Sequence, residues 1–280
     1  MKFSVNETVF VPDGKGADEA CGRTTALCFS AHQDDIEFMA YHEIANCFQK
    51  TDRWFSACVV TDGAGSPRAG LYADYTDEQM KTVRIKEQNK AATVGEYAAQ
   101  IQLGYPSKAV KDPAENAVVQ SIADVILACK PDVIYTHNFA DKHDTHVAVA
   151  LRVLAALSML RGRFTPKKLY GMEVWRSLDW MNDSDKTVFD ASAHPNLAAA
   201  LMGVYDSQIM GGKRYDSAVL GRRAANATFF ESHGTDEMEL AVYAVDMSAL
   251  LGGELTPAAF VEAEIEKFKR DVTGRIGRFT

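Results

Sequence analysis

Short apolar runs alternate with helix-length segments between residues 24 and 175, and this alternation limits the folds open to the chain. The strand-like runs lie at 24–31, 54–60, 100–104, 132–137 and 169–175, and the helical segments lie at 36–48, 77–97, 113–129 and 145–160. Strands separated by helices of this length pair in parallel and carry helices on both faces of the sheet. We therefore predict an α/β fold with a mostly parallel sheet and helices on both faces.

The segment 176–280 has a weaker pattern. It holds a predicted helix near 196–202, a strand near 240–245 and a closing helix at 257–271. No internal repeat or low-complexity tract divides the chain, so we predict a single domain over 1–280. Its recognisable core is about 24–175, and 176–280 completes the sheet and covers the site.

Composition excludes several classes of protein. The chain has 280 residues and a formal net charge of −8, which disfavours nucleic acid as a partner. No apolar run is long enough for a membrane span, and residues 1–23 lack the apolar core of a signal peptide. The five cysteines are odd in number and form no C-x-x-C pair, as is typical of free buried thiols. We expect a cytoplasmic protein, and the sequence leaves open whether it is a homo-oligomer.

Two segments rich in metal-type ligands follow predicted strands. The first is AHQDDIE at 31–37, and the second is HNFADKHDTH at 137–146. Together they contain four of the seven histidines in the chain. In an open parallel sheet, functional loops gather beyond the carboxyl ends of the strands. We therefore expect the two segments to form one site.

A catalytic zinc ion takes three protein ligands of the His and carboxylate type and keeps one open position. His32 and Asp35 are three residues apart at a strand-to-helix turn, and His146 begins the helix after the second segment. We predict that these three residues hold one divalent cation, Zn²⁺ or Fe²⁺. Asp34 is then the candidate general base, and His143 is the candidate donor to the oxyanion or leaving group.

Each segment also has a purely structural explanation. Asp35 could cap a helix that begins at Ile36, and Asp144 or Thr145 could cap the next helix. Glu37 could reach back to free backbone N–H groups, and we favour this structural role for it. For either segment alone the two explanations weigh about equally, and the occurrence of both segments at strand ends favours a site.

The first segment resembles the A-H-P-D-D-x-E signature of the PIG-L/LmbE family of zinc-dependent N-acetylglucosamine deacetylases. The HDTH sequence at 143–146 is similar to the H-P-D-H segment of that family. The other landmarks occur in the family's order, with T-x-G at 61–63, R-x-x-E at 84–87 and L-G at 103–104. The resemblance covers about 24–150, and Asp206-Ser207-Gln208 gives a weak echo of a later Ser-Gln element.

The resemblance implies a Rossmann-like α/β fold and hydrolysis of an acetamido group to an amine and acetate. It implies the same zinc ligands, base and acid that ligand type and placement suggest. It adds Arg84 as a substrate-binding residue for sugar hydroxyls. The alternative for Arg84 is an exposed helix residue that pairs with Glu87 three positions later.

Two positions depart from the family pattern. Gln33 replaces proline, which adds a backbone N–H and predicts a more flexible turn. Asp144 and Thr145 replace the family's Pro-Asp, so the residue that orients His143 is in doubt. Asp141 or Asp144 could take over that role, because each lies within a turn of His143.

Other functions remain open at this stage. Two histidines and one carboxylate also describe non-haem Fe(II) oxygenases, although those enzymes usually have all-β folds. A non-catalytic metal- or sugar-binding relative is a further alternative. The glycine-bearing loop at 62–66 fits no phosphate-binding motif and is better explained as a turn. For the aromatic side chains Trp175, Trp180, Tyr205 and Tyr215, we favour packing in the core over stacking on a sugar.

Overall fold

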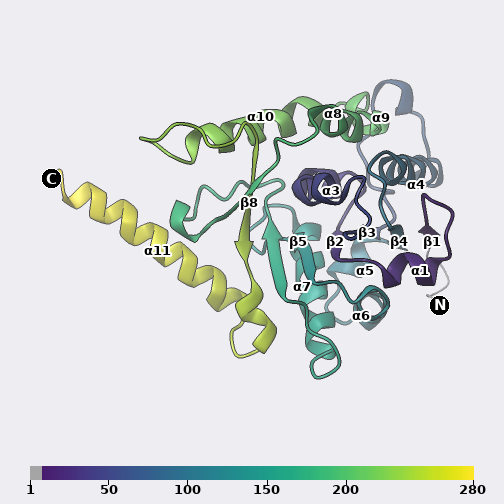
Figure 1. The fold of residues 1–280 in the computed structure, drawn as a ribbon, viewed down its shortest axis with the longest axis horizontal. Helices are drawn as coiled ribbons and strands as arrows, with labels where there is room; N and C mark the ends of the chain where they lie inside the picture. Colours follow the sequence, from purple (N-terminus) through teal and green to yellow (C-terminus); the bar gives the residue numbers. More distant parts are fainter. Residues whose placement is uncertain (1–7) are drawn as a thin grey trace.

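The computed structural model describes residues 8–280, and in this part of the chain eight strands form one sheet in the order β1-β4-β3-β2-β5-β6-β8-β7 (Figure 1). The strands are β1 (Thr8–Phe10), β2 (Ala26–Ser30), β3 (Phe55–Thr61), β4 (Ala99–Tyr105), β5 (Val133–His137), β6 (Lys168–Met172), β7 (Thr187–Asp190) and β8 (Ala241–Asp246). Strands β4, β3, β2, β5 and β6 pair in parallel, whereas β1, β8 and β7 pair antiparallel at the two edges. The predicted α/β fold with a mostly parallel sheet is confirmed.

Helices cover both faces of this sheet (Figure 1). The helices are α1 (Ala17–Gly22), α2 (Asp35–Met39), α3 (Tyr41–Cys47), α4 (Asp77–Val94), α5 (Ser107–Lys111), α6 (Asn116–Cys129), α7 (Asp144–Met159), α8 (Pro195–Gly203), α9 (Asp206–Ile209), α10 (Tyr215–Phe229) and α11 (Pro257–Gly277). Helices α1, α6 and α7 enclose one apolar core, and α2, α3, α4 and α8 enclose another on the opposite face. Burial on both faces explains why the central strands are continuous apolar runs.

Two predicted helices differ from the observed ones. The segment 36–48 is two helices, because Ala40 leaves helical geometry with φ −113° and ψ 19°. The segment 113–129 is helical only from Asn116, because the Glu115 side chain accepts the Ala117 N–H at 3.2 Å and so caps the helix there. Pro113 therefore lies in a turn before the helix and not in its first turn.

The C-terminal segment joins the same sheet. Strand β8 pairs with β6, and β7 pairs with β8 at the outer edge. Helix α10, which the sequence pattern did not reveal, packs against β8 and α8. Helices α9 and α10 also supply residues to the cleft beside the candidate metal ligands.

Two further expectations concern the whole chain. Across residues 8–280, no helix has both the length and the apolar character needed to cross a membrane. The five cysteines are buried, and none of them forms a disulfide within residues 8–280, as predicted. The prediction that the N-terminus lacks a signal peptide rests partly on residues 1–7, which lie outside the described residues.

Candidate metal centre and its cleft

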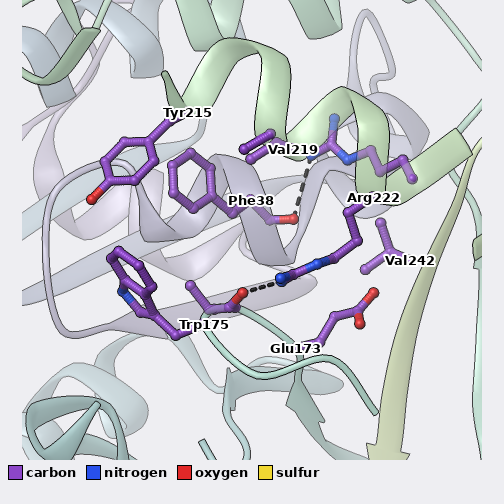
Figure 2. Close-up of a pocket in the computed structure, with 10 residues that line it drawn as sticks. Phe38, Glu173, Trp175, Tyr215, Val219, Arg222 and Val242 are labelled. Carbon is purple, nitrogen blue, oxygen red and sulfur yellow. Dashed lines mark hydrogen bonds between the residues drawn. The ribbon is translucent and has the colours of Figure 1, made fainter. Parts of the chain in front are cut away.

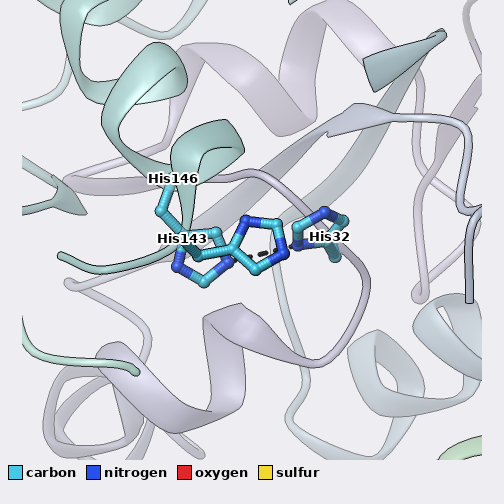
Figure 3. Close-up of side chains that lie close together, drawn as sticks. All are labelled: His32, His143 and His146. Atoms are coloured by element: carbon cyan, nitrogen blue, oxygen red, sulfur yellow. Dashed lines mark hydrogen bonds between the residues drawn. The ribbon is translucent and has the colours of Figure 1, made fainter. Parts of the chain in front are cut away.

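Two neighbouring strands bring the ligand-rich segments together. Strand β2 pairs in parallel with β5, so the loops that leave their carboxyl ends start side by side. His32 follows β2, and His146 lies in the first turn of α7, after β5. Their rings meet in the structure, with His32 Nδ1 3.2 Å from His146 Nε2 (Figure 3).

Three ligand atoms form a nearly equilateral triangle. His32 Nδ1 lies 3.2 Å from Asp35 Oδ2, and His146 Nε2 lies 3.3 Å from the same oxygen. The third edge, between the two ring nitrogens, is 3.2 Å. A tetrahedral zinc ion with bonds of about 2.0–2.1 Å sets its ligand atoms about 3.3–3.4 Å apart. The triangle therefore fits one such ion without rearrangement.

His137 is a competing ligand that the sequence analysis did not assign. Two overlapping groups, His32 with His143 and His146, and Asp35 with His137 and His146, each have ligand atoms within 4.8 Å. However, His137 Nε2 accepts the backbone N–H of Ala31 at 2.8 Å, so its lone pair is already engaged. Its ring stacks on His146 with the centroids 3.9 Å apart. His137 therefore supports a ligand and is not itself poised to be one.

A carboxylate lies next to Nδ1 of His146, the ring nitrogen outside the triangle. Asp141 Oδ2 lies 3.6 Å from His146 Nδ1, and its two oxygens also accept the backbone N–H groups of His143 and Trp175 at 2.9 and 3.0 Å. A carboxylate behind a ligand histidine fixes the tautomer and the orientation of the ring. Asp141 therefore has the position of a residue that orients His146.

The ring of His143 has a different environment. It stacks on His146 and meets His32 edge-on, with centroid distances of 4.5 and 4.9 Å. Its Nδ1 is buried and has no hydrogen-bond partner among the described residues. Asp144 is exposed and Asp141 bonds only the backbone of His143, so in residues 8–280 neither carboxylate orients the ring.

An unusual backbone conformation separates two adjacent carboxylates. Asp34 has φ 89° and ψ −33°, a region that residues other than glycine rarely adopt, and its N–H donates to Gln88 Oε1 at 3.2 Å. Its side chain turns to Arg84, 2.8 Å away, whereas Asp35 turns to the histidines. Asp35 is already the first residue of α2, and its Oδ2 accepts the His32 N–H at 2.8 Å. It does not cap that helix.

The pKa values of the two carboxyl groups move in opposite directions. Burial, opposed by the charge of Arg84, raises the pKa of Asp34 to about 7. Burial acts on Asp35 as well, but the charge and hydrogen bonds of His146 and the hydrogen bond of His32 outweigh it. The pKa of Asp35 is held well below its usual range. In turn, Asp35 and Asp141 raise the pKa of His146 to about 9 against the effect of burial.

Arg84 is the centre of a buried network. Its side chain is only 1% exposed, and it donates to the Gln33 carbonyl, Asp34 Oδ2, Glu87 Oε2 and Ser207 Oγ. The predicted pair with Glu87 is present at 3.2 Å, but Arg84 is not the exposed residue of that alternative. Ser207 belongs to the Asp206-Ser207-Gln208 sequence, which resembles the later Ser-Gln element of the family. It completes the network by donating to Glu87 Oε2 at 2.7 Å.

The turn after β3 must pass close to this network. Gly63 has φ +75°, and a Cβ at this position would lie 2.6 Å from Gln33 Oε1 and 3.1 Å from Arg84 Cβ. Both the backbone conformation and the lack of space require glycine, which accounts for the T-x-G landmark. Gln33 itself is buried and donates to Thr61 O and Gln102 Oε1, both at 3.3 Å. The prediction of a more flexible turn is wrong, because these hydrogen bonds hold the turn in place.

The contacts of Glu37 and the cap of α7 test the structural explanations from the sequence. Glu37 accepts hydrogen bonds from the side chains of Tyr97, Tyr205 and Gln88 at 2.7, 2.6 and 3.0 Å. Its role is structural, as favoured. The cap of α7 is His143, with no side-chain cap bond, so neither Asp144 nor Thr145 is the cap.

A cleft of about 340 Å³ opens beside the triangle. The residues that line it are His32, Asp34, Asp35, Phe38, Gly63, Gly65, Ser66, Pro67, Arg84, Ser107, His143, Thr145, Trp175, Gln208, Lys213 and Tyr215. Trp175 packs half-buried against the core, as predicted, but it also lines the cleft. Core packing was the wrong prediction for Tyr215, which α10 brings to the cleft. It was right for Tyr205, which is fully buried, and Trp180 packs half-buried against the core.

Comparison with known proteins gives a family match. The sequence profile described as PIG-L, GlcNAc-PI de-N-acetylase, matches residues 27–157. Residues 27–157 therefore match the PIG-L family, the family that the motifs of this segment resemble. The matched segment contains every predicted metal ligand, the candidate base and the candidate acid. A search of curated proteins gave no significant match.

Solved structures share the fold at low sequence identity. An N,N'-diacetylchitobiose deacetylase from Pyrococcus horikoshii is 13% identical, with a TM-score of 0.64 and coverage of 82% of this chain and 85% of that one. A 4-carboxy-2-hydroxymuconate hydratase from Pseudomonas putida is 17% identical, with a TM-score of 0.59 and coverage of 80% and 96%. A zinc-inhibited teicoplanin deacetylase is 13% identical, with a TM-score of 0.54 and coverage of 80% and 98%. Because a hydratase shares the fold, the reaction must be argued from the site.

Proposed function

We propose that this chain is a metal-dependent hydrolase that removes the acetyl group from an N-acetylglucosamine-type sugar or conjugate. The observation that carries the proposal is the triangle of His32, Asp35 and His146 atoms, with a second buried carboxylate, Asp34, beside it at the cleft. The deacetylases among the similar structures and the family description support the same reaction.

The ligand set suits zinc. Two imidazole nitrogens and one carboxylate oxygen at this spacing leave one coordination position for water or substrate. When bound there, the ion supplies Lewis acidity, which polarises an amide carbonyl and lowers the pKa of water. Fe²⁺ accepts the same donors, so the physiological ion is decided by measurement.

Asp34 and His143 divide the proton transfers between them. Asp34 faces the cleft and takes a proton from the attacking water, while the 2.8 Å bond from Arg84 fixes its carboxylate. His143 lines the same cleft and gives a hydrogen bond or a proton to the developing oxyanion or to the leaving amine. Arg84 also lines the cleft, and we propose that it contacts sugar hydroxyls in addition to positioning Asp34.

The experiment is acetate release from N-acetylglucosamine and its β-linked dimer by the zinc-loaded protein. Asp34→Ala should lower the rate by about 10²–10⁴-fold while the zinc content stays unchanged, because the base is lost and the ligands remain. Asp144→Ala is the matched control, since it removes an exposed carboxylate near the same site. Equal rates in wild type and Asp34→Ala would overturn the mechanism.

The same donors allow one other reaction class. Two histidines and one carboxylate are also the ligands of Fe(II) oxygenases, here on a mostly parallel sheet and not on an all-β fold. Oxygen consumption by the Fe²⁺-loaded protein with 2-oxoglutarate, without acetate release, would favour that alternative.

A further inference from the structure

A second cavity, of about 130 Å³, adjoins the metal cleft. We call it the apolar chamber. Its lining is Phe38, Glu173, Val174, Trp175, Tyr215, Ala218, Val219, Arg222, Arg223 and Val242 (Figure 2). Phe38, Trp175 and Tyr215 line both spaces, so the chamber continues the cleft on the far side of three aromatic rings.

The three rings form a connected wall that leads from the candidate acid. Trp175 stacks near His143 at a centroid distance of 6.4 Å and meets Tyr215 edge-on at 6.0 Å. Tyr215 in turn meets Phe38 edge-on at 5.1 Å. A substrate held at the metal centre therefore has an aromatic surface within reach, and this surface leads to the chamber.

The arginines of the chamber are engaged by the protein. Arg222 donates to the Val174 carbonyl (Figure 2). Arg223 donates to the carbonyls of Glu37 and Phe38, at 2.5 and 3.3 Å. These bonds hold both guanidinium groups against backbone carbonyls.

The carboxylate of Glu173 disfavours an anionic occupant. Its Oε1 accepts hydrogen bonds from Asn226 and from the Tyr243 N–H. Its Oε2 is buried without a hydrogen-bond partner in residues 8–280. The arginines are held by carbonyls, the charge of Arg222 faces that of Glu173, and valines form the remaining walls. The chamber is therefore suited to an uncharged apolar group.

We propose that the apolar chamber binds an uncharged apolar group of the substrate, aryl or alkyl, next to the acetamido group that is hydrolysed. This inference rests on the proposed deacetylation and adds the substrate class to it. The group can be carried on the anomeric oxygen or on the acyl carbon, and both sources share the same chemistry. Burial of a phenyl ring there should strengthen binding by about tenfold or more.

The test compares three ligands with the zinc-loaded protein. They are methyl N-acetyl-β-glucosaminide, its phenyl counterpart, and methyl N-phenylacetyl-β-glucosaminide. Binding is measured by calorimetry and kcat/KM by amine release. We expect at least one phenyl compound to exceed the methyl N-acetyl compound by about tenfold in affinity and in kcat/KM.

Val219→Phe fills the chamber from α10 without touching the metal cleft, since Val219 lines only the chamber. It should abolish the preference for the phenyl compound and leave the methyl N-acetyl compound unchanged. Leu220→Phe is the matched control, because Leu220 is the next residue, is 54% exposed and lies outside the chamber. If Val219→Phe fails to fold, Ala218→Trp at the exposed rim takes its place.

The outcomes separate this inference from the proposed function. Equal affinity for all three ligands in the wild type, or a preference that survives both filling variants, overturns the chamber as a subsite even if acetate is released. The chamber is supported as a subsite if a phenyl compound binds more tightly and the filling variants abolish this preference. If in that case no ligand is hydrolysed, only the proposed reaction is wrong.

Discussion

The two ends of the cleft are built in different ways. The polar end, with His32, Asp35 and His146, comes from two loops at the carboxyl ends of adjacent parallel strands. The aromatic end, with Phe38, Trp175 and Tyr215, comes from α2, the segment after β6, and α10. The first is fixed by short motifs and strand order, and the second by the docking of a distant part of the chain.

The two ends differ because metal binding and apolar binding place different demands on the fold. Ligand atoms at 3.2–3.3 Å spacing require a rigid frame, and the parallel strands provide one. An apolar subsite has looser geometric demands, since burial of apolar surface is not directional. We therefore propose that the polar end carries the reaction, while the C-terminal elements set the substrate range.

The largest expected effect tests whether the polar end depends on its buried charges. Arg84→Met removes the cation that faces Asp34 and Glu87 and leaves both carboxyl groups buried without it. We expect the free energy of unfolding to fall by about 3–5 kcal/mol in urea denaturation. Lys86→Met, an exposed position on the same helix, is the control and should change little. A loss no larger than that of the control would contradict the network.

The next effect concerns the residue that links the two ends. Asp141 faces His146 and also accepts the N–H of Trp175 at 3.0 Å. Asp141→Asn should weaken zinc binding by about 10–100-fold, because the ligand ring loses its anionic partner. Competition with a chromogenic chelator measures this, with Asp144→Asn as control. Unchanged zinc affinity would show that the two ends are not linked through this carboxylate.

A third prediction tests how the C-terminal segment docks. His42 on α3 stacks on Phe189 of β7 at 4.1 Å, and burial, together with the charge of Arg223, lowers its pKa to about 3. Only the unfolded chain takes up this proton below its ordinary pKa of 6.5, so the contribution to stability is full above that pH. As the pH falls from 6.5 towards 3, the free energy of unfolding should drop by about 1.4 kcal/mol per unit for this group.

His42→Phe should remove this slope, because phenylalanine keeps the stacking and does not titrate. Ile44→Val on the same helix is the control, since it alters core packing but removes no titrating group. The measurement is chemical denaturation at several pH values between 4 and 7. Equal slopes in wild type and His42→Phe would mean that the segment does not bury His42 as described.

The sequence predicted the polar end better than the aromatic end. Apolar runs of five to eight residues identified the central strands, whereas β1 and β7, with three and four residues, are too short to show a period. The motifs correctly predicted that His32 and His146 lie close together. The alternation of strands and helices predicts parallel strands, whose carboxyl ends lie at the same edge of the sheet. The motifs did not separate His137 from the ligands, since only the bond from the Ala31 N–H distinguishes it.

Other features depend on contacts between distant segments. The positive φ of Asp34, which directs two adjacent carboxylates apart, is stabilised by a bond to Gln88, 54 positions away. Trp175 and Tyr215 have the composition of core residues, and only the packing of α10 shows that they line a cleft. Spacing within a motif carries no information on such contacts.

The central claim is one metal ion held by two imidazoles and one carboxylate, with His137 outside the ligand set. X-ray absorption at the zinc edge of the zinc-loaded protein counts bound imidazoles directly. We predict two imidazoles in the wild type, two in His137→Gln and one in His146→Ala. Three imidazoles in the wild type, or a count that falls in His137→Gln and not in His146→Ala, would contradict the account.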